Sequence, residues 1–494
     1  MALTKAHNRM IEASAVNVKD FGAVGDGVTD DTTAIQAAFD EGGVIYFPSG
    51  TYLVSSALTG TSLYIMGNQA TLKLSSVSFG ALELSGDNNV VEDLIILGTG
   101  AAGQWSSNGV NFGIKFPSYS AKNNTVRNCK FTNLIYMGVD LKSSYSTIND
   151  CYFENCGYGA VFSYNRFNNI LNNQFISCGN ATSTYTGAVI SVTYQALDGY
   201  NMQTTVAERN IIDGNFISTS AQVGIDTHSG YNLTITNNVI NDTDLEAIYL
   251  HRTSPAAEGL TDADGRVYGC VVDSNNIFNC LSGVTFSSFE ASDATDRLGC
   301  YENIVSNNKI SGCTSAGITF ARGSNRNKAV GNIVSNCGIA MYIFYWSDEN
   351  YVNGNTFIAG SGTGAVVRVN VTGANTNYCD NNVIENNIID LHGFDINGID
   401  NNNARYTNIK MNDFLNRGDA YPIEDAEAGT ARQALIVHMP RAYSIVNATV
   451  GDMVGEIQYN LAPSAGGTIG WVCTTAGDES STNGTWKTFG TIAV

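Results

Sequence analysis

The chain has 494 residues, and its 45 acidic side chains outnumber the 25 basic ones to give a formal net charge of −20. This charge argues against nucleic acid and anionic membrane surfaces as partners, because phosphate binding needs clustered Lys and Arg. Hydrophobic residues make up 43% of the chain and support a large core, while no apolar run approaches the ~20 residues that span a bilayer.

The N-terminal part, residues 1–43, predicts a short helix before the first strand. Residues 29–32 offer capping oxygens and negative charge at the start of a helix near residues 31–41. Its apolar residues recur at helical spacing and two glycines follow them: Ala34, Ile35, Ala38, Phe39, Gly42 and Gly43. We expect this helix to cover the open end of a sheet structure, since a bare last strand is an aggregation-prone edge.

A short phrase recurs along the middle of the chain: one aliphatic residue, two or three polar residues rich in Asn, and one aromatic or aliphatic residue. Its first copies end at Phe131, Phe153 and Phe175, at even spacing, and longer spacings indicate an inserted loop or a second coil. Further copies end at Phe216, Val239, Ile277, Ile310, Phe357, Ile388 and Phe414. Units this short bury a core only by stacking on their neighbours.

A second strand with period-two alternation follows each copy, as in Gly138-Val139-Asp140-Leu141 and Gly224-Ile225-Asp226-Thr227. Strand alternation on a repeat of about 22 residues predicts an all-β, parallel β-helix fold over residues 44–418. Leucine-rich repeats would need a regular leucine framework and a helical side, and a propeller would need a period roughly twice as long.

Asn and Cys recur at fixed positions in the repeat. Two residues before the apolar end points stand Cys129, Cys151, Asn173, Gly214, Asn237, Asn275, Asn308, Asn355, Asn386 and Asn412. Equivalent positions on neighbouring coils are ~4.8 Å apart, so these Asn side chains are predicted to form an amide ladder. The 11 Cys are expected to be small buried residues, because no CxxC pair or Cys/His cluster indicates disulfides or zinc.

The segment VNVKDFGAVGDGVTDDTTAIQAAFDEGGVIYFPSGTYLV, which starts at Val16, resembles the start of the pectate-lyase-like β-helix of bacteriophage tailspikes and capsule depolymerases. The resemblance implies a homotrimeric, right-handed parallel β-helix that folds in the host cytoplasm and acts from the virion tail. It implies bacterial capsular or surface polysaccharide as substrate. It transfers no catalytic residues, because the family places its acids differently from member to member.

Aligning the second strands on their glycines separates outward from inward positions. One outward column then reads Asp140, Val161, Val189, Asp226, Tyr249, Thr285 and Thr319, and the other reads Lys142, Ser163, Ser191, His228, His251, Ser287 and Ala321. Two of the five His therefore fall on adjacent coils, with Arg252 directly after them and Arg322 in the same place two coils later. This concentration of Asp, His, Tyr and Arg predicts a saccharide groove.

Glycoside hydrolysis needs two carboxyl groups, about 5–5.5 Å apart for retention or about 6.5–9.5 Å apart for inversion. Asp140 lies three or more coils from Asp226, ~14 Å or further, and makes a poor pair with it. The predicted catalytic pair is Asp226 with either Glu246, which opens the adjacent strand, or Glu290, which lies on a loop two coils along.

The other polar and aromatic residues of the groove receive supporting roles. His228 and His251 would tune pKa values or hold the sugar, and Arg252 and Arg322 would bind its acidic or hydroxyl groups. The remaining expected sugar-binding residues are Asp140, Tyr249 and Trp346. Hydrolysis is the first hypothesis for the function, and no cofactor and no metal ion are expected.

Two alternative functions stay open. The stacked His also suit a lyase, in which an Arg or His neutralises a uronate carboxylate and a His or Tyr takes the C5 proton. A non-catalytic receptor-binding adhesin, which would bind the polymer without shortening it, is the third hypothesis.

The composition changes near residue 418, beyond which three of the six Pro fall: Pro422, Pro440 and Pro463. Residues 419–494 are predicted to form a small C-terminal β-domain. Its resemblance to the ends of phage tail fibres implies trimerisation or sugar binding. The segment before Val16 is short for a virion anchor, so attachment is expected to run through a tail or adaptor protein.

Overall fold

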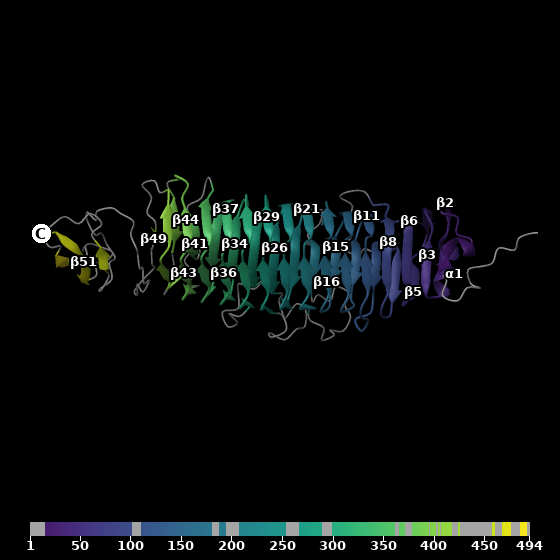
Figure 1. Cartoon of the computed structure of the whole chain (residues 1–494), viewed down its shortest axis with the longest axis horizontal. Helices are drawn as coiled ribbons and strands as arrows, with labels where there is room; N and C mark the ends of the chain where they lie inside the picture. The colour runs from purple at the N-terminus through teal and green to yellow at the C-terminus, as the bar shows by residue number, and fades with distance from the viewer. Residues whose placement is uncertain are drawn as a thin grey trace, which may run out of the picture.

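The computed structural model describes residues 15–100, 110–179, 187–193, 207–252, 266–288, 299–360, 365–370, 378–394, 396–401, 404–405, 407–416, 423–424, 457–459, 467–475 and 485–491. The chain winds into an elongated parallel β-helix whose coils follow one another along the long axis (Figure 1). The predicted fold class is confirmed. Among the described residues, no helix is long and apolar enough to cross a membrane.

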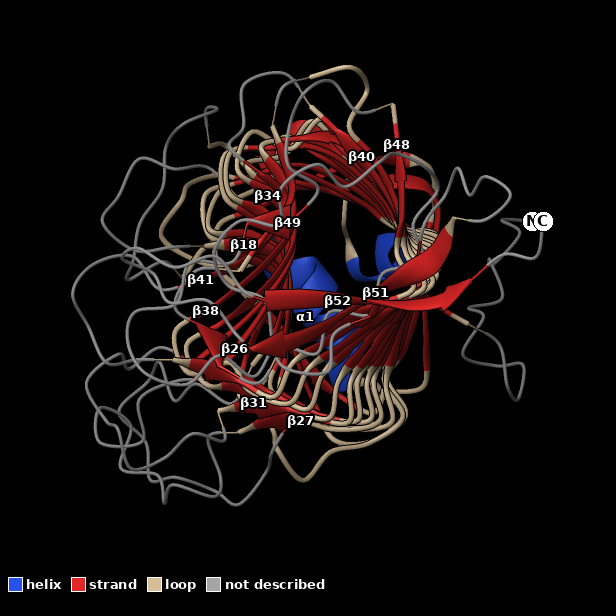
Figure 2. Cartoon of the chain, turned by 90° about the vertical axis from the view of Figure 1, so that its left-hand side faces the viewer, coloured by secondary structure: helices blue, strands red, loops and turns tan. Residues whose placement is uncertain are grey.

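The capping helix is α1, Thr32–Asp40, and it follows the 3-10 turn η2, Val18–Phe21. Ile35, Ala38 and Phe39 of α1 are buried against the first coils, as predicted, and the view down the axis shows α1 within the outline of the strands (Figure 2). The Asp31 carboxylate does not cap the helix. It accepts hydrogen bonds from Val24 N–H and Gly25 N–H at 2.6 and 3.0 Å, so it fixes the preceding loop instead.

Three parallel ladders of short strands form the coils. The first two ladders merge at the N-terminal end through the long strands β6 Tyr64–Leu74 and β8 Val90–Leu97. The shorter strands before them are β1 Val16–Asn17, β2 Asp26–Asp30, β3 Val44–Phe47 and β4 Gly50–Val54. The first ladder continues through β10 Thr125–Arg127, β13 Thr147–Asn149, β16 Asn169–Leu171, β20 Ile211–Asp213, β24 Thr234–Thr236, β28 Val271–Asp273, β32 Ile304–Ser306, β36 Lys328–Val330, β39 Tyr351–Asn353, β43 Val383–Glu385 and β47 Asn408–Lys410.

The second ladder runs beside the first and comprises β11 Lys130–Leu134, β14 Tyr152–Cys156, β17 Gln174–Ile176, β21 Phe216–Ser220, β25 Val239–Thr243, β29 Asn276–Phe278, β33 Lys309–Ser311, β37 Ile333–Cys337, β40 Thr356–Ala359, β44 Ile388–Asp390 and β48 Asp413–Leu415. Minor strands lie at a corner: β19 Ala207–Glu208, β23 Gly230–Tyr231, β27 Val267–Tyr268, β31 Cys300–Tyr301, β35 Ser324–Asn325, β42 Cys379–Asp380 and β46 Ala404–Arg405.

The third ladder carries the predicted groove. Its strands are β5 Leu58–Thr61, β7 Leu82–Ser85, β9 Phe112–Phe116, β12 Met137–Leu141, β15 Gly159–Ser163, β18 Ala188–Val192, β22 Val223–His228, β26 Glu246–Arg252, β30 Ser282–Ser288, β34 Ala316–Ala321, β38 Ile339–Phe344, β41 Ala365–Asn370, β45 Asn397–Asp400 and β49 Ile423–Glu424. Near the C-terminus, β50 Ile457–Tyr459, β51 Thr468–Thr475 and β52 Thr485–Thr491 pair antiparallel, unlike the strands of the helix.

Stacked side chains fill the interior. Phe131, Phe153 and Phe175 are fully buried, and their rings stack at 4.6 and 4.9 Å between centroids on successive coils. The ten Cys from Cys129 to Cys379 are buried free thiols, as predicted from their spacing.

The amide ladder exists, with a corrected register. Its members are Asn173, Asn215, Asn238, Asn275, Asn308, Asn332, Asn355, Asn387 and Asn412, each donating from Nδ2 to the Oδ1 of the next at 2.9–3.0 Å. The predicted positions Gly214, Asn237 and Asn386 are wrong by one residue. These three have φ near +60° and form the turn, which leaves the following Asn to point inward.

A second amide ladder was not predicted. It connects Asn303, Asn327, Asn350 and Asn382 at 3.0–3.2 Å between Nδ2 and Oδ1 of successive coils. It lies at another corner of the coil, where the first ladder of strands begins.

The register of β15 also differs from the prediction. Alignment on glycines placed Val161 and Ser163 outward, but the structure pairs Val139 with Val161 and Asp140 with Phe162. Val161 and Ser163 are therefore inward and fully buried, and Phe162 points outward. The physical reason is that Gly159 pairs with Met137 rather than with Gly138, which brings the Tyr158 ring onto Tyr136 at 5.5 Å.

Candidate functional site

Two neighbouring strands of the third ladder bring the predicted groove residues together. Asp226 pairs with Tyr249 and His228 pairs with His251 in the parallel register of β22 and β26. Because side chains alternate along a strand, all four face the same side of the sheet. The adjacency that was expected from the glycine alignment is present at these two coils.

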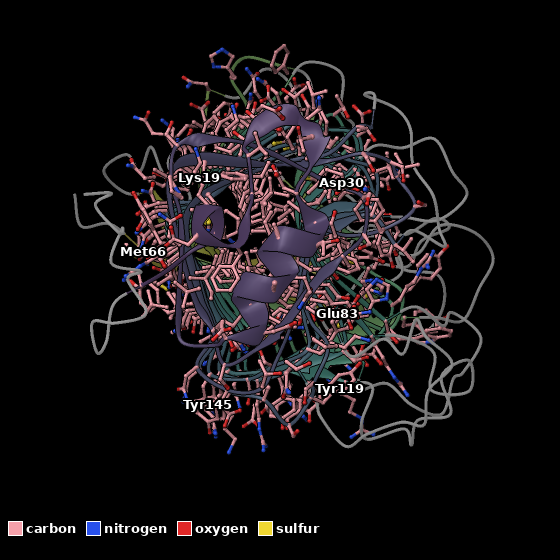
Figure 3. All side chains as sticks on the ribbon, turned by 90° about the vertical axis from the view of Figure 1, so that its right-hand side faces the viewer. Lys19, Asp30, Met66, Glu83, Tyr119 and Tyr145 are labelled. Atoms are coloured by element: carbon pink, nitrogen blue, oxygen red, sulfur yellow. The ribbon has the colours of Figure 1, made fainter. Side chains whose placement is uncertain are left out.

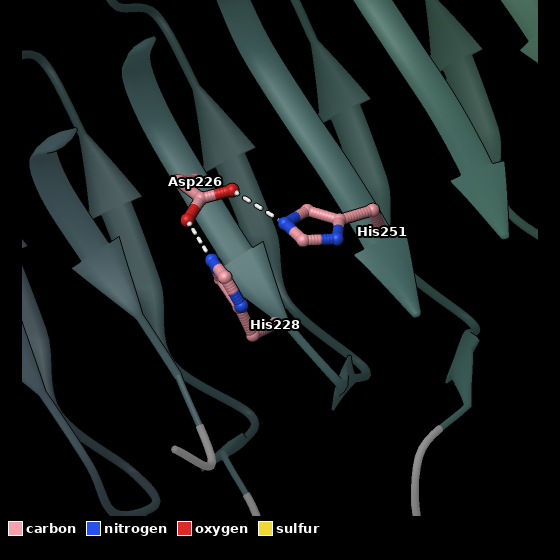
Figure 4. A group of neighbouring side chains, drawn as sticks. All are labelled: Asp226, His228 and His251. Carbon is pink, nitrogen blue, oxygen red and sulfur yellow. Dashed lines mark ion pairs between the residues drawn. The ribbon is translucent and has the colours of Figure 1, made fainter. Parts of the chain in front are cut away.

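Both imidazoles reach one carboxylate (Figure 4). His228 Nε2 lies 2.8 Å from Asp226 Oδ2, and His251 Nε2 lies 3.2 Å from Asp226 Oδ1. The second contact lacks hydrogen-bond alignment, since Oδ1 has no aligned donor among the described residues. Asp226 and His251 are buried, at 7% and 6% exposed, whereas His228 is more accessible.

The protonation of this cluster follows from burial and mutual charge. Burial by itself raises the pKa of Asp226, but the charges of His228 and His251 outweigh it and hold the pKa well below its ordinary value. Burial first, and then the nearby His228, lower the pKa of His251. The ring centroids of the two imidazoles are 4.1 Å apart, so the cluster holds an ionised Asp226 and does not charge both His.

Tyr249 completes the cluster on the same face. Its ring stacks on His251 with centroids 4.3 Å apart and planes 16° apart. Burial raises the pKa of Tyr249, and Glu246 adds to the shift. The phenol therefore stays protonated at neutral pH and is available as a proton donor.

Glu246 opens β26, three positions before Tyr249. Burial raises its pKa, and the charge of Asp226 contributes to the shift, so the two carboxyls sense each other. Three strand positions correspond to ~10 Å, so Glu246 lies farther from Asp226 than either imidazole does. Glu290 lies outside the described residues.

The remaining predicted residues spread along the groove. Arg252 is buried at the end of β26, and Arg322 holds the equivalent position two strands later, directly after β34. Asp140 shares the outward column of Asp226 but is three strands away, ~14 Å. Trp346 sits in the turn after β38, with φ at 53°, three strands beyond β26. The structure therefore does not bring Asp140, Arg322 or Trp346 to the cluster.

Tyr158 was missed by the sequence analysis. Burial raises the pKa of Tyr158 to about 12, and the charge of Asp226 contributes to the shift, which brings this tyrosine into the electrostatic field of the site. The wrong register for β15 hid it, because that alignment ignored the residue before Gly159. The repeated Tyr at 136 and 158 was the available signal.

The donor set also fits a metal ion in part. Asp226, His228 and His251 bring one ligand atom each within 4.8 Å of one another, and one carboxylate with two imidazoles is a set that transition metals bind. The same atoms already pair with each other at 2.8 and 3.2 Å, which accounts for their positions without an ion.

Comparisons with known protein sequences match short parts of the chain. A family described as rhamnogalacturonase A/epimerase, pectate lyase-like, matches residues 15–112. Mannuronan C5-epimerase AlgE5 of Azotobacter vinelandii is 64% identical over 44 residues, which are 8% of this chain and 4% of that protein. Plasmin and fibronectin-binding protein A of Streptococcus pneumoniae is 57% identical over 49 residues, 9% of this chain and 7% of that protein.

These matches span less than a tenth of the length of each relative, and their names include an epimerase and a binding protein. An alginate lyase of A. vinelandii, 50% identical over 64 residues, covers 10% of this chain and 8% of that protein. The matched segments are therefore shared with proteins of different named activities and do not choose among them.

Solved structures extend the likeness along the β-helix. The tailspike protein of E. coli bacteriophage HK620, in complex with a hexasaccharide, has a TM-score of 0.60 at 14% identity. The alignment covers 81% of this chain and 78% of the tailspike chain. The catalytic unit of a GH87 alpha-1,3-glucanase from Streptomyces thermodiastaticus has a TM-score of 0.59 at 14% identity, covering 73% and 66%. The A-module of mannuronan C-5 epimerase AlgE6 of A. vinelandii has a TM-score of 0.51 at 20% identity, covering 70% and 100%. The resemblance to tailspike β-helices is confirmed for the fold.

Proposed function

We propose that this protein is a polysaccharide-active enzyme whose active site is the outward face around Asp226, and that it cleaves an acidic polysaccharide by elimination. The single observation that carries the proposal is the Asp226 carboxylate held between His228 and His251. A buried carboxylate that orients an imidazole makes that imidazole a general base. Elimination, second to hydrolysis in the sequence analysis, is favoured because the best-oriented base is a histidine.

The roles follow from position and protonation. Asp226 orients His228, the more accessible imidazole, and in its neutral form His228 takes the proton from the sugar carbon beside a uronate carboxylate. The electrons of that C–H bond form a C=C bond as the neighbouring C–O bond breaks. The departing oxygen takes a proton from Tyr249, and Arg252 offsets the charge of the uronate.

Hydrolysis remains a second candidate because two carboxyls have pKa values shifted in opposite directions. Burial raises the pKa of Glu246, whereas the two histidines keep Asp226 ionised, and an acid and a base with separated pKa values are what hydrolysis requires. In that mechanism Glu246 protonates the leaving oxygen and Asp226 activates water. Their separation along the sheet favours inversion over retention.

Product analysis separates the candidates. Purified bacterial capsular polysaccharides, alginate and polygalacturonate are incubated with the protein, and chain length, reducing ends and ultraviolet absorbance are followed. Shorter chains with the absorbance of an unsaturated uronate support elimination, and new reducing ends without that absorbance support hydrolysis. Specific binding with unchanged chain length in every polymer supports the adhesin hypothesis and contradicts the enzyme proposal.

We also propose the biological setting that the tailspike resemblance implies, a homotrimer on a phage tail that acts at the bacterial surface. Its support is the shared β-helix fold and the separate antiparallel sheet of β50, β51 and β52 near the C-terminus. Sedimentation or light scattering at micromolar concentration tests the assembly, and a monomer there contradicts the trimer.

A further inference from the structure

A second apolar cluster lies on the outside of the β-helix, apart from the interior core. Its buried members are Phe112, Met137, Phe162 and Tyr164, and Tyr119, Tyr136 and Tyr158 pack against them as partly buried residues. Outward positions on a solvent-facing sheet normally carry polar side chains, so an aromatic cluster there requires an explanation. We call these seven residues the aromatic platform.

The rings of the platform form one continuous surface across β12 and β15. Tyr136 and Tyr158, on successive coils, stack with centroids 5.5 Å apart. Tyr158 stacks on Phe162 at 5.0 Å, and Phe162 lies 6.2 Å from Tyr164. The cluster therefore extends both along the β-helix axis and along the strand, and its partly exposed rings are Tyr119, Tyr136 and Tyr158.

The platform continues directly into the proposed active site. Phe162, Ser191 and Asp226 occupy successive positions of the same outward column, so Phe162 is two coils, ~10 Å, from the Asp226 carboxylate. Only the small Ser191 lies between them in that column. Tyr158, at the edge of the platform, also senses the charge of Asp226.

Cations accompany the aromatic rings, in a protein of net charge −20. Lys142 Nζ lies 5.5 Å from the Tyr119 ring centroid and 6.0 Å from that of Tyr164. Lys115 Nζ lies 5.5 Å from the Phe112 ring centroid. Pyranose rings present apolar C–H faces to aromatic rings, and ammonium groups beside them select a carboxylated sugar.

We propose that the aromatic platform is a saccharide-binding subsite for an acidic polysaccharide, which lies along the β-helix axis and passes from the platform across Asp226. The proposal rests on the proposed function for its substrate class. It adds a binding surface on the N-terminal side of the reacting bond, built from residues that the sequence analysis did not single out.

The competing explanation is that these rings only pack for stability, and another part of the chain offers a matched control. Tyr231, Tyr268 and Tyr301 stack at 4.9 and 5.2 Å at the corner of the minor strands, with Arg326 5.6 Å from Tyr301. This second stack also combines aromatic rings with a cation.

Figure 3, which looks at the N-terminal end, shows that Tyr119 of the platform lies well apart from Tyr145, a tyrosine outside it.

The test measures binding in a His228→Ala background, so that cleavage does not interfere. Immobilised bacterial capsular and O-polysaccharides, alginate, polygalacturonate and neutral dextran serve as probes. Tyr136→Ala and Tyr158→Ala are expected to weaken binding to the acidic probe that the parent binds by about tenfold or more. Tyr158→Phe, which keeps the ring, and Tyr268→Ala, the control, are expected to bind like the parent, and circular dichroism checks that each variant is folded.

Each outcome supports or overturns the subsite. Unchanged affinity in both Tyr136→Ala and Tyr158→Ala, an equal loss in Tyr268→Ala, or binding of no acidic probe by the parent overturns it. Failure of the proposed function appears differently, as undiminished cleavage in the His228→Ala variant or as binding without any cleavage by the wild type. Weaker binding in the two platform variants supports the subsite in either case.

Discussion

Removing one rung of the first amide ladder should destabilise the whole β-helix measurably. The Asn275 amide donates to Ile235 C=O at 2.9 Å and to Asn308 Oδ1 at 3.0 Å. Its Oδ1 accepts from the Asn238 backbone N–H at 2.9 Å and from Asn238 Nδ2 at 3.0 Å. The Asn275→Ala substitution leaves that buried N–H without its acceptor and takes one donor from the Ile235 carbonyl.

The expected cost follows from these two backbone groups. An unsatisfied buried donor costs about 1–3 kcal/mol and a lost hydrogen bond about 1 kcal/mol, so Asn275→Ala should lower the free energy of unfolding by about 2–4 kcal/mol. Asn241→Ala, on the outside of a neighbouring coil, is the control. Asn241 has only long contacts, 3.5 Å to Ser218 Oγ and 3.3 Å from Asn279 Nδ2, and its loss should cost about 0.5 kcal/mol or less.

Urea unfolding followed by circular dichroism measures the difference, with hydrogen exchange of a peptide spanning 234–239 as a local readout. Asn275→Ala should shift the midpoint to lower urea with little change in slope, and should speed exchange in that peptide. Equal midpoints for Asn275→Ala and Asn241→Ala would refute the view that the ladder stabilises the fold.

Three further predictions concern the site. Asp226→Asn should lower turnover by about 10²-fold or more while polymer binding persists, because it removes the charge that orients His228; wild-type turnover in steady-state kinetics would place the chemistry elsewhere. The pKa of His251 lies below its ordinary 6.5, so the unfolded chain binds the extra proton and stability is lost as pH falls below about 6.5. Urea midpoints at pH 8 and pH 5 should therefore fall more in the wild type than in His251→Asn, and an equal fall contradicts the assignment. Dialysis against a chelator should leave the cleavage rate unchanged, since pairing at 2.8 and 3.2 Å accounts for the positions of the Asp226 and His atoms without an ion; loss of activity restored by a divalent cation would instead establish a metal site.

The fold could be predicted because the same few positions repeat on every coil. Phe131, Phe153 and Phe175 mark the repeat in the sequence, and the structure stacks them in one buried column. The adjacency of His228 and His251 could also be predicted from the sequence, since a short coil without insertion joins their strands. Register within a coil was harder, because shifting a strand by one residue exchanges its two faces.

Two places in the chain show why the other details of the structure could not be predicted from the sequence. At β15, Gly159 pairs with Met137 of the preceding strand, and Phe162, assigned to the interior by the glycine alignment, is part of the outward platform. At the turns, either of two adjacent Asn could point inward, and only the left-handed backbone at Asn237 assigns the ladder to Asn238. Distances such as that between Glu246 and Asp226 depend on side-chain paths that a repeat pattern does not contain.

The hydrogen-bond geometry of the amide ladder does not depend on how many residues separate two successive Asn. Asn173 and Asn215 are 42 residues apart in sequence, Asn215 and Asn238 only 23, yet both pairs form the same 3.0 Å bond. Insertions between rungs therefore leave the anchoring geometry unaltered, and the added entropy of loop closure grows only slowly with length. A lineage can therefore lengthen, shorten or exchange the segments between the rungs while the β-helix scaffold stays unchanged, so adaptation to a new target requires new loops and no change of fold.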